Sequence, residues 1–287
     1  MNVAVIGAGT VGTAVAVLLE RAGHRIVGIS GRTETRRRAS SYLPRAPFLE
    51  PAEAAAAAEL VVIGTPDDVI DQTVGELVAA AAVGSGTSVT HLSGSLGLDA
   101  LRAAGEAGAR ILAIHPLQTF PDVDSALERL PGCWIAITAE DEDGHLLGER
   151  LALDLEGVPF RLADELRPLY HAAAVFASNY LVTASAIAET LFDIAGVPDP
   201  AEAMRPLQRA SLEHVERRGP ARALTGPAVR GDAGTIRRNL EALERHAPGL
   251  VPTYIAMAKA TLELAERSGR LAPGSRTAVE DALAAWS

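Results

Sequence analysis

The sequence predicts an α/β protein in which a domain built on a parallel sheet is followed by an all-α domain. Up to about residue 163, short apolar runs of strand length alternate with amphipathic helical periods, the pattern of strands joined by crossover helices. Beyond that point the strand signals stop and only long helical periods remain. We therefore expect a sheet domain over residues 1–163 and a helical domain over residues 164–287.

The sheet domain begins with a strand, a glycine-rich turn, a helix and a second strand. The strands are expected at 2–6 and 25–29, with the helix at 11–21. The turn has the spacing G-x-G-x-x-G, in which glycines permit a tight turn, close approach to a pyrophosphate and close helix packing. A purely structural glycine turn is disfavoured by this strand-helix-strand context. The segment predicts a Rossmann-type site whose cofactor is held by Gly7, Ala8, Gly9, Thr10, Val11 and Gly12.

The end of the second strand indicates which dinucleotide binds. An NAD site usually places Asp or Glu there to hold the ribose 2′-hydroxyl. This chain has Ser30, Gly31, Arg32 and Thr33 instead. Hydroxyls and a guanidinium suit a 2′-phosphate, so NADP is favoured over NAD, with Arg32 as the main contact. The arginines at 36–38 are interpreted mostly as a solvated helix face.

Further strands are expected at 60–63, 87–92, 109–114, 133–138 and 158–162. The first three of these end in the polar clusters TPDD, HLSGS and HPLQTF. In an open parallel sheet, ligands bind outside the carboxyl ends of the strands, so these clusters should lie beside the glycine turn. Each cluster alone could be an ordinary turn, because turns favour the same residue types.

These clusters supply the candidate site residues of the sheet domain. Thr65, Pro66 and Ser93 are expected near the cofactor, and His115 near the reacting atoms. Substrate contacts are expected from Ser95 and Gln118. Asp67 and Asp68 are interpreted as capping the next helix, and His91 is open between a core residue and a site residue.

Composition limits the other classes of function. The net charge of −10 argues against broad nucleic-acid binding. The sequence has no run of about eighteen apolar residues, so we expect no membrane span. A single Cys133 fits a reducing compartment. We expect a cytoplasmic protein with no membrane or nucleic-acid partner and no bound metal.

The helical domain opens with a predicted helix over 166–195 that carries polar residues in apolar surroundings. His171 and Ser178 are seven residues apart, so they fall on nearly the same face, with Asn179 on the neighbouring stripe. His171 is the best candidate for a general acid because imidazole exchanges its proton near neutral pH. Ser178 and Asn179 would orient a substrate; the alternative is that they bond only to neighbouring backbone.

Later helices are expected at about 200–218, from Thr235 onward, at 252–268 and at 276–286. Between the first two, the segment TGPAVRGD forms a compact turn from which Arg230 projects. Arginine can hold a carboxylate in a bidentate manner, so Arg230 is a candidate substrate ligand. A salt bridge with Asp232 or a plain surface position is an equal alternative.

These segments together resemble a family of bacterial two-domain Rossmann-like oxidoreductases whose helical half is a domain of unknown function. The matching segments are GAGTVG, VIGTPDDVI, HLSGSLG, ILAIHPLQTF, LYHAAAVFASNYLV and LTGPAVRGD. Wider relatives include 6-phosphogluconate and 3-hydroxyacid dehydrogenases, ketopantoate reductase and pyrroline-5-carboxylate reductase. The resemblance implies hydride transfer at an interdomain cleft and a homodimer formed through the helical domains.

The chain departs from those relatives at one position of chemical importance. Hydroxyacid dehydrogenases and the usual ketopantoate reductases place a catalytic lysine on the first interdomain helix, whereas the only lysine here is Lys259. The proton donor must then be His171, another residue or water.

The leading hypothesis is an NADP-dependent reductase of a small 2-oxo acid, with ketopantoate and pantothenate synthesis suggested by the resemblance. Prephenate dehydrogenase-like or imine reductase activity is the enzymatic alternative. An NADP-binding redox sensor without catalysis is the alternative of another class.

Overall fold

The computed structural model describes residues 1–271 and 274–286. The chain divides into two compact units, Met1–Tyr180 and Leu181–Ser287. The last strand ends at Arg161, one residue before the predicted end at 162, and the division falls later than residue 163. The reason is that the first helix after the sheet is hydrogen-bonded into the sheet's loops and belongs to the first unit.

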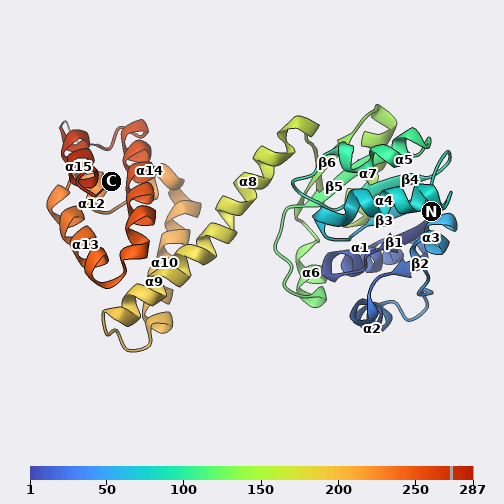
Figure 1. Ribbon diagram of the computed structural model, residues 1–287, viewed down its shortest axis with the longest axis horizontal. Helices are drawn as coiled ribbons and strands as arrows, with labels where there is room; N and C mark the ends of the chain where they lie inside the picture. The colour runs from blue at the N-terminus through green and yellow to red at the C-terminus, as the bar shows by residue number, and fades with distance from the viewer. Residues whose placement is uncertain (272–273, 287) are drawn as a thin grey trace. The chain divides into compact units, whose positions relative to one another are not determined.

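The first unit is built on a seven-stranded sheet of order β2-β1-β3-β4-β5-β6-β7 (Figure 1). Its strands are β1 (Asn2–Ile6), β2 (Arg25–Ser30), β3 (Leu60–Ile63), β4 (Ser88–His91), β5 (Arg110–Pro116), β6 (Trp134–Ala139) and β7 (Val158–Arg161). The α/β prediction and the predicted strands are confirmed, with ends shifted by one or two residues. The exception to parallel pairing is β6, which runs antiparallel to β5.

Helices cover both faces of the sheet because β1 and β3 are apolar at successive positions. Val3 and Val5 point into one core, while Ala4 and Ile6 point into the other. The first core is closed by α1 (Thr10–Arg21), α6 (Val123–Arg129) and α7 (Glu142–Asp154). The second is closed by α3 (Pro51–Ala56), α4 (Ile70–Ala79) and α5 (Arg102–Glu106) (Figure 1). Burial on both faces accounts for the continuous apolar runs.

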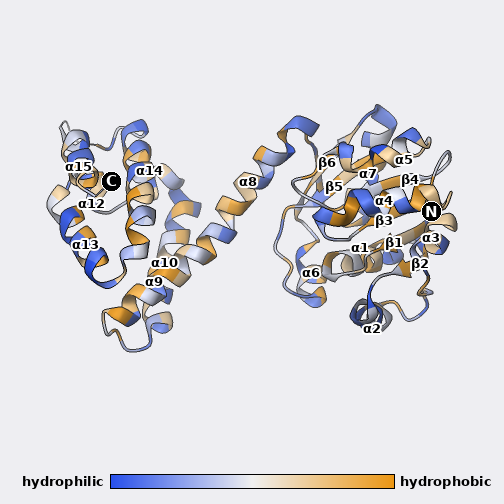
Figure 2. Ribbon diagram, in the orientation of Figure 1, coloured by the Kyte–Doolittle hydropathy of each residue, from blue (hydrophilic) through white to orange (hydrophobic). Residues whose placement is uncertain are grey.

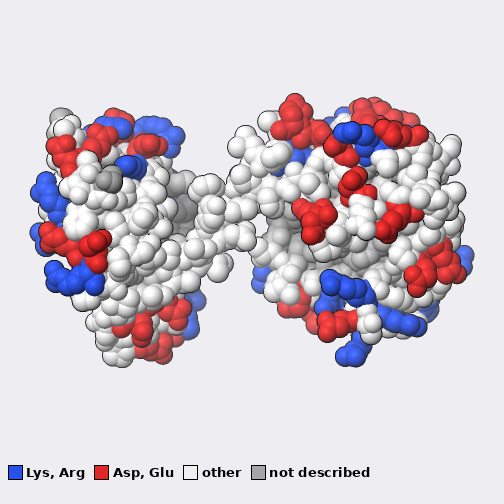
Figure 3. Space-filling model, viewed as in Figure 1, with Lys and Arg blue, Asp and Glu red and all other residues white. Residues whose placement is uncertain are grey.

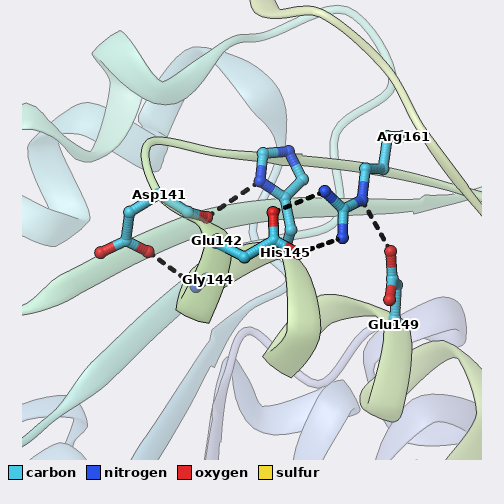
Figure 4. Close-up of polar contacts among 6 residues, drawn as sticks. All are labelled: Asp141, Glu142, Gly144, His145, Glu149 and Arg161. Carbon is cyan, nitrogen blue, oxygen red and sulfur yellow. Dashed lines mark hydrogen bonds and ion pairs between the residues drawn. The ribbon is translucent and has the colours of Figure 1, made fainter.

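The far edge of the sheet is fastened by polar contacts between α7 and β7 (Figure 4). The Arg161 guanidinium donates to both carboxylate oxygens of Glu142 at 2.7 Å and to Glu149 at 2.7 Å. Asp141 caps α7 by accepting from the Gly144 amide at 2.7 Å. These contacts hold the first and second turns of α7 against the edge strand.

The helix predicted over 166–195 is divided in the structure. It consists of α8 (Arg167–Ala177) and α9 (Asn179–Ile194), with Ser178 between them at φ −125° and ψ −68°. The prediction of one helix is therefore wrong at Ser178, whose backbone leaves the helical region. By length and composition alone, the stretch Asp164–Ile194 passes a test for a membrane-spanning helix, and one such helix is weak evidence.

The second unit is helical, as predicted. It contains α10 (Pro200–Arg218), α11 (Pro220–Ala223), α12 (Pro227–Arg230), α13 (Ala233–His246), α14 (Val251–Arg267) and α15 (Ser275–Ala284). Its core joins apolar residues of α13, α14 and α15, and Figure 2 shows the polar residues of α13 on the side away from them. The helix expected to start at Thr235 starts at Ala233, because Asp232 is the cap and accepts from the Thr235 amide at 2.9 Å.

Candidate functional site

The glycine turn lies where β1 and β3 meet, the point at which the strand order reverses. Gly7 has φ +85°, and a Cβ there would lie 2.7 Å from the Thr65 amide nitrogen. A Cβ on Gly64 would lie 2.7 Å from the Gly7 carbonyl oxygen. The turn is also tied to β2, because the amides of Gly7 and Ala8 both donate to the Ser30 carbonyl at 3.0 Å. Such close backbone approach requires glycine.

The helix that follows the turn presents its N-terminus to open space. Gly9 is the N-cap of α1, no side chain caps this end, and a Cβ on Gly9 would meet no atom within 4 Å. The first-turn amides of Thr10, Val11 and Gly12 therefore have the geometry that accepts an anion at a helix N-terminus. The arrangement fits the pyrophosphate of a dinucleotide, as the sequence predicts.

The end of β2 carries the residues expected to select the dinucleotide. Ser30 is buried, whereas Gly31, Arg32 and Thr33 are exposed. Arg32 is the N-cap of α2 (Thr33–Tyr42), and Arg36 on this helix lies over the Phe48 ring at 5.3 Å. Figure 3 shows basic side chains gathered over α2. The part of the site that would face a ribose phosphate is therefore positive.

The loops after β3 and β4 are joined through Asp67. Its carboxylate accepts from Ser93 Oγ at 2.6 Å and from Ser95 Oγ at 3.0 Å. Ser93 Oγ also accepts from the amides of Ser95 and Leu96, so its hydroxyl is used within the turn. Asp67, expected to cap a helix, holds these serines instead. The Thr65 hydroxyl is buried without a hydrogen-bond partner among the described residues.

His91, which the sequence leaves open, lies in the core. It is fully buried; its Nδ1 accepts from the Ser93 amide at 3.2 Å and its Nε2 donates to the Gly97 carbonyl at 3.1 Å. With both ring nitrogens engaged, the imidazole is neutral. Burial lowers the pKa of His91 to about 4. The residue supports the loop after β4.

A pocket of about 560 Å³ lies in the first unit and contains most of the predicted reactive residues. Its polar lining is His115, Gln118, Thr119, Tyr170, His171, Ser178 and Asn179; alanines, Leu117 and Val175 complete it. His115 comes from β5 and His171 from α8, with ring centroids 6.5 Å apart. Ser95 is not among the lining residues, and neither are Thr65 and Ser93. Arg230 belongs to the second unit, where it ends α12 and is exposed.

Gly94 allows the two histidines to approach the same point. A Cβ on this residue would lie 2.8 Å from His115 Nε2 and 2.9 Å from His171 Nδ1. His171 Nδ1 is buried and has no hydrogen-bond partner among the described residues. A buried ring nitrogen without a partner is costly in a folded protein, so it marks a place where a ligand can supply one.

Tyr170 pairs with His115 inside the pocket. The Tyr170 hydroxyl lies 2.7 Å from His115 Nδ1. Burial lowers the pKa of His115 to about 4, with smaller contributions from Arg167 and His171. Burial also raises the pKa of Tyr170 to about 12. Both groups are therefore uncharged near neutral pH.

Arg167 holds the loop after β4 against α8. Its side chain is fully buried and donates to the carbonyls of Ser93 and Leu96 and, at 3.0 Å, to Thr138 Oγ1. Burial lowers the pKa of its guanidinium. These contacts fix Gly94, and hence the approach of both histidines.

Sequence reasoning missed Tyr170, Arg167 and Gly94 as parts of this site. One signal was present: Arg167, Tyr170 and His171 are the polar residues of RPLYHAAAVFA, a helix with apolar surroundings. An arginine at the start of such a helix indicates a buried polar partner.

Two family models account for most of the chain. A Rossmann-like domain model matches residues 1–116, and a domain of unknown function, DUF2520, matches residues 133–261. The chain thus combines a Rossmann-like domain with a DUF2520 domain. No curated protein matches this chain.

Solved structures share the fold of this Rossmann–DUF2520 protein. A candidate NADP oxidoreductase from Bacteroides fragilis is 24% identical with a TM-score of 0.75, covering 91% of this chain and 98% of its own. A Thermotoga maritima protein is 24% identical with a TM-score of 0.70, covering 92% and 98%. An imine reductase from Streptomyces aurantiacus is 21% identical with a TM-score of 0.58, covering 99% and 94%. At these identities the likeness establishes the fold.

Proposed function

We propose that this protein is an NADP(H)-dependent oxidoreductase that reduces a C=O or C=N bond. The observation that carries the proposal is the pocket in which His115 and His171 converge on Gly94. The pocket and the glycine turn belong to one unit, and parallel β1, β3, β4 and β5 end at the same edge of its sheet. A dinucleotide site and a proton-donating pocket at one edge suit hydride transfer.

The residues present fit an NADP cofactor. The amides at the start of α1 would hold the pyrophosphate, and Arg32 would contact the 2′-phosphate. Ser30, Gly31 and Thr33 complete that end, and Thr65, which precedes Pro66 in the chain, lies beside the turn. When bound, the reduced cofactor supplies a hydride to the substrate carbon.

The side chains of the pocket supply the proton and orient the substrate. His171 gives a proton to the substrate oxygen or nitrogen as the carbon is reduced. His115, uncharged at neutral pH, donates a hydrogen bond to the same atom. Asn179, Ser178 and Gln118 line the wall against which the rest of the substrate would lie.

A small 2-oxo acid is the substrate class that we propose first, with ketopantoate as the specific compound. The role of Arg230 as a ligand of its carboxylate stays a prediction from the sequence, made because a guanidinium binds carboxylates in a bidentate manner. The likeness in fold to an imine reductase supports including cyclic imines as the second class. Prephenate remains a third candidate because a His-Pro pair ends β5.

The test is a screen of the purified protein in which absorbance follows the cofactor. NADPH is offered with 2-oxo acids and with cyclic imines, and NADP is offered with prephenate. We expect turnover with one class, reduced roughly 10²–10⁴-fold in His171→Ala. His145→Ala is the matched control because His145 is a partly exposed residue on α7 that does not line the pocket and has its Nδ1 2.9 Å from the Asp141 carbonyl oxygen. Tight NADPH binding with no reaction of any compound would favour a redox sensor and contradict the proposal.

We further propose that the protein is a cytoplasmic homodimer formed through its helical segment. Leu169, Phe176, Tyr180, Leu181 and Val182 are large apolar side chains exposed on α8 and α9. Exposed apolar surface of this kind is typical of an interface. Light scattering of the purified protein should give twice the chain mass; a monomer, or a requirement for detergent, would contradict this.

A further inference from the structure

We propose that Tyr170 is a positioning residue that keeps the His115 proton on Nε2. In this state His115 presents a neutral N–H donor to the pocket. The part of this proposal that concerns the substrate rests on the function proposed above. The part that concerns the imidazole stands on the geometry of the pair alone.

The geometry of the pair leaves the phenol little freedom. The Tyr170 oxygen lies 2.7 Å from His115 Nδ1, and the two rings meet edge to face with centroids 5.5 Å apart. Phe160 also packs against Tyr170, with ring centroids 6.0 Å apart. The hydroxyl is therefore held at one ring nitrogen by packing as well as by its hydrogen bond.

The direction of the hydrogen bond follows from counting protons. A neutral imidazole has one N–H, and a phenol has one O–H. If His115 donated from Nδ1, the phenol proton would have no acceptor among the described residues, and Nε2 would face Gly94 as a lone pair. If Tyr170 donates, its proton is satisfied and Nε2 carries the proton of the ring. The second arrangement leaves only the Nε2–H without a protein partner, on a ring that lines the pocket, where a ligand can accept from it.

The groups around the pair keep it uncharged. Besides Tyr170, the titratable or charged groups that act on His115 are Arg167 and His171 from α8, His91 from β4 and Asp67 from the loop after β3. Burial is the largest cause that disfavours the imidazolium and lowers the pKa of His115, and Arg167 is the largest contribution from a charged group. The Tyr170 pKa of about 12 keeps its proton available for donation.

The two histidines then have different roles in one reaction. His115 keeps its proton throughout and stabilises the negative charge that develops on the substrate oxygen or nitrogen. With the hydride that a bound reduced cofactor would supply to the carbon, the π electrons of the C=O or C=N bond move to the heteroatom, and His171 gives that atom a proton. His171 regains its proton from solvent. Cofactor oxidation balances the reduction of the substrate.

The direct test is nitrogen NMR of histidine-labelled protein, with the His115 signals identified by their loss in His115→Gln. We expect His115 in the wild type to have a protonated Nε2 and an unprotonated Nδ1, unchanged from about pH 6 to 9. In Tyr170→Phe, which keeps the ring, the Nδ1 signal should shift and the tautomers should mix. Tyr42→Phe is the control, because it removes a hydroxyl bound to Asp124 elsewhere in the same unit.

A wild-type His115 protonated on Nδ1, or a Tyr170→Phe spectrum identical to that of the wild type, would overturn the proposal. Under turnover, Tyr170→Phe should lower kcat by roughly 10–100-fold with little change in KM, by analogy with groups that orient metal-bound imidazoles. If the wild type has the expected tautomer but reduces no compound in the screen, the result supports the assignment of Tyr170 and contradicts the proposed function.

Discussion

At the scale of single residues, the pocket depends on Gly94, which the sequence presents only as part of a turn. Two rings approach it from separate elements, and neither leaves room for a methyl group. The Gly-rich motif at the N-terminus is easier to recognise, although both glycine sites serve the same purpose of close approach. At Gly94 the atoms that approach closely are those of the rings of His115 and His171.

Replacing Gly94 by alanine should therefore displace His115 and His171. A shift of about 1 Å at reacting groups can cost roughly 10²-fold in rate, so we expect a loss of kcat/KM of that order. Gly75→Ala is the control: a Cβ there meets nothing within 4 Å, and alanine should stabilise α4 by about 1 kcal/mol. Equal kcat/KM for Gly94→Ala and wild type would contradict the assigned geometry.

The sequence predicts part of this pocket because helical periodicity places His171 and Ser178 on one face. His115 was found from its position at the end of a strand. Tyr170 and Arg167 were missed because their partners are 55 and 71 residues away in the chain. Local patterns give the face of a helix, but not the loop that it touches.

At the scale of elements, α8 is attached to the sheet through its first residue. Arg167 binds two carbonyls of the loop after β4 and the Thr138 hydroxyl of β6. This attachment explains why the compact unit extends to Tyr180. The strand spans were predictable because buried parallel strands are apolar throughout. The antiparallel direction of β6 was not predictable, because the residue pattern does not encode strand direction.

Arg167→Met should separate α8 from the sheet loops. The change leaves buried carbonyls without donors, so we expect the free energy of unfolding to fall by about 3 kcal/mol. Arg150→Met, at an exposed position on α7, should change it by less than about 0.5 kcal/mol. Urea denaturation measures both, and equal stability of the two variants would show that Arg167 does not anchor the helix.

At the scale of the whole molecule, two buried histidines make stability depend on pH. Burial lowers the pKa of His91 and His115 from 6.5 to about 4. The unfolded chain therefore binds more protons between these values, and stability is fully present above pH 6.5. It is lost as the pH falls towards 4, by up to about 3 kcal/mol per histidine.

Carboxylates also titrate in this window, so the comparison with a variant isolates the histidine contribution. The unfolding free energy of His115→Gln should fall less steeply between pH 6.5 and 4 than that of the wild type. Denaturant titrations at a series of pH values measure this difference. Parallel curves would mean that His115 is not held in its neutral form.

The central claim is that this protein transfers a hydride from NADPH to a C=O or C=N carbon. The most direct measurement uses NADPH carrying deuterium at the transferred position, incubated with the protein and pooled 2-oxo acids and cyclic imines. We predict that mass spectrometry will find a reduced product carrying deuterium on the former carbonyl or imine carbon, at a strongly reduced level in His171→Ala. NADPH that binds to the folded protein but leaves no deuterium on any compound would contradict the account.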